Sequence, residues 1–369
     1  MEEWKEYKLA DVCSRLRSGK GIKSDSVLDA GPYPVIGGNG IRGYANESNF
    51  KGECAVIGRQ GAYCGNVRFY EGEAYMTEHA VVVVGNELAD TRFLACLLSL
   101  MHLGNLSAQS AQPGISVQTL SKQIVSLPSI DYQKRVSAVI KSLDDKTEVN
   151  RRINENLEQQ AQALFKSWLE GCQDEVSIGD LSLNITDYSK CNHDQVVLIN
   201  SSDVTEGFFD HHILSPNKDL KGHFKKRFKK GDILYSQVRP RNRHWGYCTF
   251  DADNYLASTQ LMVIRNKEEL IPSILLYQYI IDDKVWMDFT LKTETRSGTF
   301  PQGNYEDLSS IRVPYSSDVD SISKELNSLY SMIYNNEQES RRLTELRDAL
   351  LPRLMSGELK VNDLENNEI

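Results

Sequence analysis

Apolar residues recur at heptad spacing over two long stretches of the chain. This spacing predicts a helix over 128–171 and another over 314–357, because residues three and four apart share one face of a helix. An apolar seam of this kind packs against a second helix, so we expect the two to pack together as a coiled coil. The seam positions are Val136, Ile140, Leu143, Leu157, Ala161, Leu164 and Trp168 in the first stretch, and Ile322, Leu326, Leu329, Ile333, Leu343, Leu350 and Leu354 in the second.

The two helical stretches are copies of one another. A single offset of 186 residues aligns them without a gap from Pro128 to Gly171. Asn150 and Asn336 fall at equivalent seam positions, where a polar side chain costs stability but fixes the register. We therefore expect a rigid spacer whose register Asn150 and Asn336 set. A helical bundle with polar gaps facing solvent is the alternative.

The segments 1–127 and 172–313 also correspond, more loosely. Lys51–Gly61 (KGECAVIGRQG) resembles Lys230–Pro240 (KGDILYSQVRP), and short runs of Val, Ile, Tyr and Phe alternate with Gly, Asn and Asp in both. These patterns favour short strands with a few helices. The expected fold is α+β (mixed α/β), with two duplicated globular domains separated by two long helices. Residues 358–369 are expected to form a polar C-terminal tail.

Charge and motifs narrow the possible functions. The 42 basic residues are outnumbered by 51 acidic ones, which excludes a uniformly basic surface but not a local patch. Such a patch is present over 221–243, which holds nine Lys or Arg and one acidic residue. No HExxH, GxSxG or phosphate-binding loop occurs, and the seven scattered cysteines form no CxxC pair, so we expect no catalytic residue and no metal site. The absence of a signal-like start or a long apolar run leads us to expect a cytoplasmic protein without membrane contact.

Several motifs resemble those of the specificity subunit of type I restriction–modification systems. They are Gly31–Tyr44 (GPYPVIGGNGIRGY), Ile57–Val67 (IGRQGAYCGNV), Met76–Val83 (MTEHAVVV), the LPxxxxQ pattern of Leu127, Pro128 and Gln133, and Leu350–Leu359 (LLPRLMSGEL). The resemblance covers nearly the whole chain. The second long helix departs from it by lacking the glutamine of the first, and the second globular domain matches more weakly.

The resemblance implies a non-catalytic subunit of a methylation and restriction complex. Each globular domain would be a target-recognition domain that reads one half of a split double-stranded DNA sequence. The two long helices would form an antiparallel coiled coil that sets the spacing. Two methyltransferase subunits would dock on the coil, and restriction subunits would join them. The chain would hold no cofactor of its own, whereas S-adenosylmethionine, ATP and Mg would bind the partner subunits. A duplicated, non-catalytic scaffold for protein partners and an enzyme fused to a coiled coil are the alternatives.

DNA recognition needs cations for phosphates and hydrogen-bonding side chains for base edges. If 237–243 is extended, alternation places Gln237, Arg239, Arg241 and Arg243 on one side, although Pro240 favours an edge or a loop. His79 is also compatible with a purely structural role. Two polar loops, 110–116 and 296–302, are further candidates. The expected contacts are Asn39, Arg42, Arg59, Gln60, Tyr63, Asn66, Thr77 and His79 in the first domain, and Lys225, Lys226, Arg227, Lys229, Lys230, Gln237, Arg239, Arg241, Arg243, Thr259 and Gln260 in the second.

Overall fold

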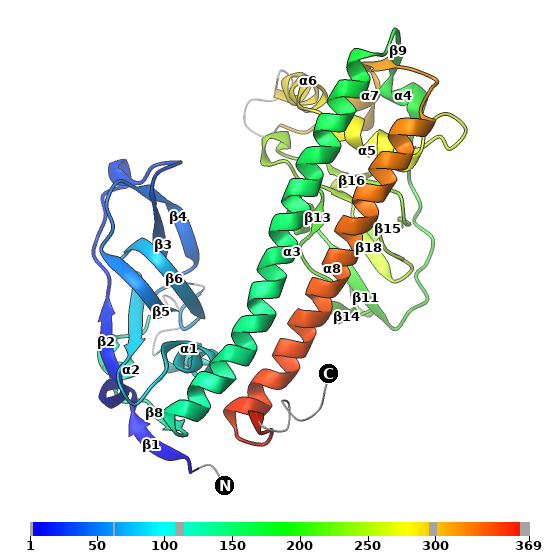
Figure 1. Cartoon of the computed structure of the whole chain (residues 1–369). Helices are drawn as coiled ribbons and strands as arrows, with labels where there is room; N and C mark the ends of the chain where they lie inside the picture. Colours follow the sequence, from blue (N-terminus) through cyan, green and yellow to red (C-terminus); the bar gives the residue numbers. More distant parts are fainter. Residues whose placement is uncertain (1–2, 62, 108–113, 221, 295–300, 362–369) are drawn as a thin grey trace. The chain divides into compact units, whose positions relative to one another are not determined.

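The computed structural model describes residues 3–61, 63–107, 114–220, 222–294 and 301–361. The chain divides into two compact units, one made of 1–149 and 339–369 and the other of 150–338. Both long helices, α3 (Ile130–Glu170) and α8 (Asp320–Met355), contribute to both units (Figure 1). Each unit is therefore a globular domain packed on its own portion of the two helices.

The two helices run antiparallel within each unit. In the first unit, Lys146 lies 3.1 Å from Glu339, and the next contact along the pair joins Asp144 to Arg347 at 3.0 Å. In the second unit, Trp168 Nε1 donates to the carbonyl of Asp318 at 3.2 Å. α8 begins later than the apolar pattern suggested, because residues 312–315 form strand β20 (Arg312–Tyr315).

The first domain is built on one six-stranded sheet with the order β2-β7-β5-β6-β3-β4. The parallel pair β3–β6 is the one departure from antiparallel pairing in this sheet. A separate pair, β1–β8, joins the beginning of the domain to the segment that leads into α3. The strands are β1 (Lys5–Lys8), β2 (Cys13–Ser18), β3 (Tyr33–Gly37), β4 (Gly40–Ala45), β5 (Phe50–Gly58), β6 (Val67–Met76), β7 (Ala80–Gly85) and β8 (Ile124–Leu127), and the helices are α1 (Thr91–Leu100) and α2 (Val117–Ser121).

A hydrophobic core joins this sheet to the helices of the first unit. Ala55, Ile57, Val81 and Val83 project from one face of β5 and β7 because alternate residues of a strand share a face. They pack with α1 and with both long helices. The buried long-helix members of this core are Tyr132, Val136, Ile140, Leu350, Leu354 and Met355. The segment expected to be a polar tail begins in the same core, since Leu359 packs on it and Val361 is fully buried.

The second domain repeats this strand order but splits the sheet in two. The order β10-β19-β16-β17 corresponds to β2-β7-β5-β6, and a second sheet has the order β14-β11-β18-β15. The strands are β9 (Asp174–Ser177), β10 (Ser182–Ile185), β11 (Gln195–Ile199), β12 (Val204–Thr205), β13 (Phe208–Phe209), β14 (Leu214–Pro216), β15 (Phe224–Lys226), β16 (Ile233–Ser236), β17 (Trp245–Tyr247), β18 (Tyr255–Ser258), β19 (Leu261–Asn266) and β20, and the helices are α4 (Ile178–Leu181), α5 (Ser273–Ile281), α6 (Asp283–Glu294) and α7 (Tyr305–Ser309).

The split follows from one interruption. Strand β6 is continuous over ten residues, whereas its counterpart in the second domain is broken into β17 and β18 by residues 248–254. The parallel pair β11–β18 preserves the β3–β6 pairing of the first domain. Residues of β16 and β19 alternate between two cores: Ile233, Tyr235, Met262 and Ile264 face the core that includes the long helices, and Leu234, Leu261 and Val263 face the core shared with the second sheet.

Polar side chains interrupt the seam between α3 and α8 in the second unit. Asn336 Nδ2 donates to Asn154 Oδ1 at 2.8 Å, and Asn150 Nδ2 donates to the Asn336 carbonyl at 3.4 Å. Glu158 lies two turns after Asn150 on α3. Its Oε2 accepts a hydrogen bond from the hydroxyl of Tyr330 on α8 at 2.6 Å. Burial raises the pKa of the Glu158 carboxyl, although hydrogen bonds from Tyr330 and Gln162 act in the opposite direction.

This raised pKa predicts a pH-dependent effect of Glu158→Gln. Below the ordinary value of 4.5 the carboxyl is protonated in both the folded and the unfolded chain, so folding carries no penalty from ionisation. As the pH rises past 4.5 the unfolded chain ionises first, which lowers the stability of the folded state. We therefore expect the unfolding midpoint of the variant, relative to that of the wild type, to increase as the pH rises above 4.5. This difference should then become constant once the carboxyl of the folded wild type is also ionised. The same change at the exposed Glu155 is the control, and a difference that does not vary with pH would contradict the assignment.

Candidate nucleic-acid interface

Three loops of the first domain meet through their backbones. The Arg59 amide donates to the His79 carbonyl at 2.9 Å, which joins the loop after β5 to the loop between β6 and β7. The turn between β3 and β4 lies against both, because a Cβ on Gly38 would lie 3.1 Å from the His79 oxygen and 3.2 Å from the Gly58 Cα. A side chain at position 38 would therefore crowd both of the other loops.

This junction brings together the residues that the sequence suggested for the first domain. Arg59 and His79 are partly exposed, and the remaining candidates apart from Thr77 are exposed. The Tyr63 side chain, in the loop after β5, is 51% exposed. The exposed candidates are Asn39, Arg42, Gln60, Tyr63 and Asn66.

Thr77 does not belong to this surface. Its side chain is fully buried, and its amide donates to the Ile36 carbonyl at 2.9 Å, so the residue continues the pairing of β3 and β6. Arg68 was not among the expected contacts but lies here. Its Nη2 donates to Asn39 Oδ1 at 3.1 Å. Arg68 is exposed on β6, and the alternation of that strand is the signal that could have identified it.

The basic run of the second domain is used partly inside the protein. Lys226 is buried, its Nζ donates to the Leu261 carbonyl at 2.6 Å, and burial lowers its pKa. Arg227 Nη2 donates to the Asp253 carbonyl at 2.7 Å. Lys225 is exposed and lies 4.8 Å from the centre of the Tyr188 ring. The structure thus removes Lys226 from the set of surface contacts and gives Arg227 an internal partner.

Residues 237–243 do not form the extended segment that would place every second side chain on one face. Pro240–Asn242 forms a 3-10 turn, and the flanking Arg239 and Arg243 have φ angles of 50° and 52°. Arg241 Nη2 lies 2.8 Å from Glu294 Oε2. Arg243 pairs with Asp283 at 3.1 Å and stacks on the Trp286 ring at 4.1 Å. Two arginines of this segment are therefore already engaged by acidic side chains of α6.

Other candidates of the second domain lie beside this turn. The Gln237 amide donates to the Gln260 carbonyl at 2.9 Å, and the Thr259 amide donates to the His223 carbonyl at 2.8 Å. Gln260 is exposed, and Gln237 and Thr259 are partly exposed. The strand ends after β16 and before β19 are thus adjacent, as are the Arg59 and His79 loops in the first domain. Residues 110–113 and 296–300 of the two polar loops lie outside the described residues.

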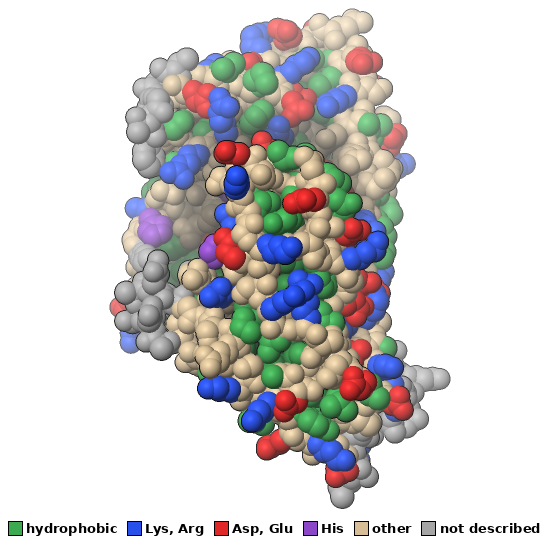
Figure 2. All heavy atoms as spheres, turned by 90° about the vertical axis from the view of Figure 1, so that its left-hand side faces the viewer, with side chains coloured by type: hydrophobic (Ala, Val, Ile, Leu, Met, Phe, Trp, Pro, Cys, Tyr) green, Lys and Arg blue, Asp and Glu red, His purple; other side chains and the backbone are tan. Residues whose placement is uncertain are grey.

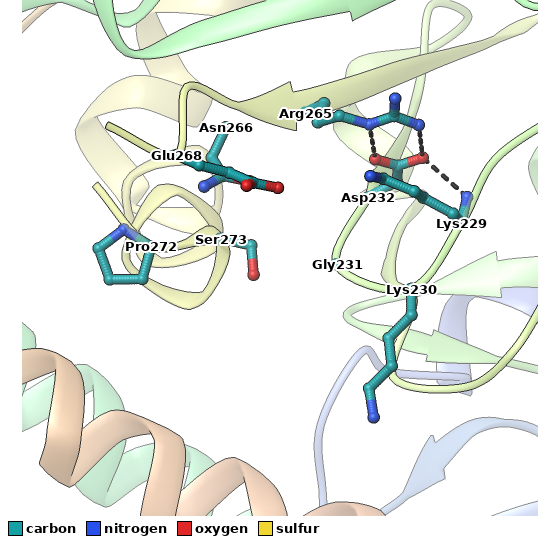
Figure 3. Close-up of a pocket in the computed structure, with 9 residues that line it drawn as sticks. All are labelled: Lys229, Lys230, Gly231, Asp232, Arg265, Asn266, Glu268, Pro272 and Ser273. Atoms are coloured by element: carbon teal, nitrogen blue, oxygen red, sulfur yellow. Dashed lines mark hydrogen bonds and ion pairs between the residues drawn. The ribbon is translucent and has the colours of Figure 1, made fainter. Parts of the chain in front are cut away.

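Lys229 and Lys230 lie at a polar pocket of the second domain (Figure 3). Asp232, which is fully buried, forms a bidentate ion pair with Arg265 at 2.6 and 2.7 Å and accepts the Lys229 amide at 2.8 Å. The Lys230 side chain points away from this pair, with its Nζ 5.5 Å from the centre of the Tyr334 ring. The charge of Arg265 is neutralised, whereas the exposed side chains of Lys229 and Lys230 remain accessible.

The surface charge is mixed. On the face shown in Figure 2, Lys and Arg side chains are interspersed with Asp and Glu instead of forming one continuous stripe.

Among the described residues, no cluster of three His, Cys, Asp or Glu could hold a metal ion. Within the same residues no helix is both long enough and apolar enough to cross a membrane.

The loop junction of the first domain predicts a severe effect of Gly58→Ala. The new Cβ would lie 2.3 Å from the Tyr63 carbonyl oxygen and 2.8 Å from that of Gly38, so the loops would have to separate. We expect a loss of about 2 kcal/mol or more in unfolding free energy, measured by chemical denaturation. Gly21→Ala is the control, because its Cβ would meet only the Glu78 Oε2 atom at 3.9 Å. Equal stability of the two variants would show that the loops do not meet as described.

The first part of the chain is similar in sequence to known proteins. Residues 1–159 match the family model for the type I restriction modification DNA specificity domain. The EcoprrI specificity subunit of Escherichia coli is 37% identical over 149 residues, which cover 39% of this chain and 37% of that protein. The HindI specificity subunit of Haemophilus influenzae is 36% identical over 179 residues, which cover 48% of this chain and 39% of that protein. The matches thus span less than two thirds of either relative.

The fold extends the likeness beyond the first domain. The crystal structure of a type I restriction-modification system S subunit from M. genitalium superposes with a TM-score of 0.57, covering 96% of both chains at 15% identity, which shows a shared fold. Residues 1–159 are thus similar in sequence to type I restriction modification DNA specificity domains, and the chain shares its fold with a solved S subunit.

Proposed function

We propose that this protein is the DNA-reading subunit of a type I restriction–modification complex and has no catalytic residue of its own. The observation that carries the proposal is the three-loop junction of the first domain, where the backbones of the loops meet and Asn39, Arg42 and Gln60 are exposed. Asparagine or glutamine can bridge adenine through two hydrogen bonds, and an exposed arginine can neutralise a phosphate.

The second domain would read the other half of a split double-stranded target. Its corresponding loops place Gln237 beside Gln260, with Lys225, Lys229 and Lys230 exposed in the same domain. The amides fit base contacts and the lysines fit phosphate contacts. Arg241 and Arg243 would join only after leaving Glu294 and Asp283. We assign them lower weight than Lys229 and Lys230 for this reason.

The paired helices would set the distance between the half-sites and bind two methyltransferase subunits. Apolar side chains stay exposed on the described parts of both helices, including Ile153, which is 40% exposed, and Met332, which is 50% exposed. Exposed apolar positions on a helix pair are suited to protein contact. S-adenosylmethionine would bind the methyltransferase subunits, and ATP and Mg would bind restriction subunits. The complex would act in the cytoplasm, where it meets host and foreign DNA.

The decisive experiment is co-expression with a methyltransferase subunit, followed by sequencing of modified bases in host DNA. We expect a methylated split motif with one fixed gap, because two domains held on one helix pair read two half-sites at a set distance. A complex that forms but binds no DNA and leaves no motif would favour the scaffold alternative. A methylated motif that is continuous instead of split would contradict the assignment of one half-site to each domain.

Salt dependence separates phosphate contacts from internal ion pairs. Arg42 is exposed at the first domain's loop junction, so we expect Arg42→Ala to weaken binding of the assembled complex and to reduce the slope of log K against log salt by about 0.9. Arg241→Ala is the matched control, since Glu294 already holds that guanidinium. DNA binding is measured by fluorescence anisotropy between about 50 and 200 mM salt. A reduced slope for Arg241→Ala with no change for Arg42→Ala would reverse the two assignments.

A further inference from the structure

Buried polar groups join each globular domain to its own portion of the long helices, and they differ between the two units. In the first unit the group is centred on Gln133, the glutamine of the LPxxxxQ pattern, which is fully buried. Its Oε1 accepts the Asp90 amide at 2.9 Å, and its Nε2 donates to the Leu88 and Pro128 carbonyls, each at 2.9 Å. Gln133 thus satisfies the backbone at the start of α1 from the first turn of α3.

A serine one turn later completes this group. Ser137 Oγ donates to Asp90 Oδ1 at 2.5 Å, and the same Asp90 oxygen accepts the Phe93 amide at 2.9 Å as the N-cap of α1. Two neighbouring positions of α3 therefore hold one end of α1. The angle at which α1 meets the helix pair is fixed by directional bonds in addition to apolar packing.

The second unit cannot build the same group. The offset of 186 residues places Val319 at the position of Gln133 and Ser323 at the position of Ser137. Ser323 is 7% exposed, and its hydroxyl has no hydrogen-bond partner among the described residues. The serine was retained in the repeat, but neither the glutamine nor an aspartate partner accompanies it. Some other contact must orient the second domain on its helices.

A different set of residues takes this place in the second unit. Gln278 of α5 is 1% exposed, and its Nε2 donates to the Tyr330 hydroxyl of α8 at 2.7 Å. The same hydroxyl donates to Glu158 Oε2 of α3 at 2.6 Å. α5 follows its sheet in the chain as α1 does in the first domain. One chain of two hydrogen bonds therefore connects the domain to both long helices.

Apolar packing alone would not fix this junction. The surrounding core contains Leu157, Leu326 and Ile333, and hydrophobic contact is non-directional, so small rotations of the domain cost little. A buried hydrogen-bonded chain is different, because a shift leaves a carboxyl and an amide without partners. Polar groups at helix interfaces serve in other proteins to select one register at some cost in stability.

We propose that Glu158, Tyr330 and Gln278 are positioning residues that set the orientation of the second recognition domain on its helices. By fixing this orientation, the three residues would determine how precisely the complex selects the gap between the two half-sites. The inference rests on the proposed function and adds a residue-level determinant of gap selection. These residues touch neither DNA nor a partner subunit in this role, and they act by holding the domain that does.

The test measures methylation of two DNA substrates by the co-expressed complex: one with the preferred gap and one with the gap changed by one base pair. Gln278→Leu should lower the ratio of the rate on the preferred gap to the rate on the changed gap by about fivefold, the scale expected when one buried hydrogen bond is lost. Tyr330→Phe removes both hydrogen bonds of the chain and should lower this ratio by at least as much. Glu158→Gln should keep the ratio, because an amide oxygen still accepts from Tyr330. Tyr334→Phe, one turn along α8, is the matched control.

The outcomes separate the two levels of the proposal. A wild-type complex that methylates no split motif contradicts the proposed function itself. A wild type that selects its gap, with Tyr330→Phe and Gln278→Leu selecting it equally well, overturns the positioning role. An equal loss of methylation on both substrates also overturns it, because that is the result of lowered stability alone, which thermal unfolding of each complex would register. Because the ratio is taken within one preparation, a smaller folded fraction cannot imitate the expected result.

Discussion

The hydrogen bonds among Asn150, Asn154 and Asn336 decide which residues of α3 face which residues of α8 in the second unit. A leucine seam would pack almost as well after sliding by one heptad, whereas these amides lose their partners if it slides. The hydrogen bonds that join α3 and α8 further along the pair depend on this alignment. Tyr330 lies opposite Glu158 only in this register, and Gln278 can complete its chain of bonds only when both are in place.

The long helices and the repeat could be predicted because each produces a periodic pattern in the sequence. Heptad spacing identified the long helices, and the constant offset revealed the repeat. The start of α8 could not be predicted from spacing, because β20 competes for the residues after Ile311 through pairing with β9, a contact between distant parts of the chain. The burial of Thr77 likewise follows from the sheet, where its amide extends the β3–β6 pairing, and no local signal marks it.

The charged residues show a different limit of prediction. A count of lysines and arginines over 221–243 treats each as a surface cation, yet the structure uses several of them internally. Lys226 binds a carbonyl beneath the surface, and Arg243 pairs with Asp283 while stacking on Trp286. Arg239 and Arg243 adopt left-handed backbone angles, which bulky side chains seldom do. The segment is therefore not an extended strand, and its side chains do not alternate between two faces. The acidic partners of Arg241 and Arg243 lie 53 and 40 residues away in the chain.

The interruption between β17 and β18 has a consequence for how such a protein can change over generations. Because the strand is broken, the outer sheet β14-β11-β18-β15 builds cores of its own, and β16 and β19 stand between these and the core on the long helices. Substitutions in the outer sheet are therefore separated by β16 and β19 from the core on the long helices, whereas Tyr334 of α8 packs on the outer core directly. In the first domain, β5 and β7 lie in the same way between the core on the long helices and a second core that includes Ile36 and Met76. Drift in sequence should accordingly run faster in the outer layer of the second domain, which would free it to acquire new preferences while the scaffold that carries it stays unaltered.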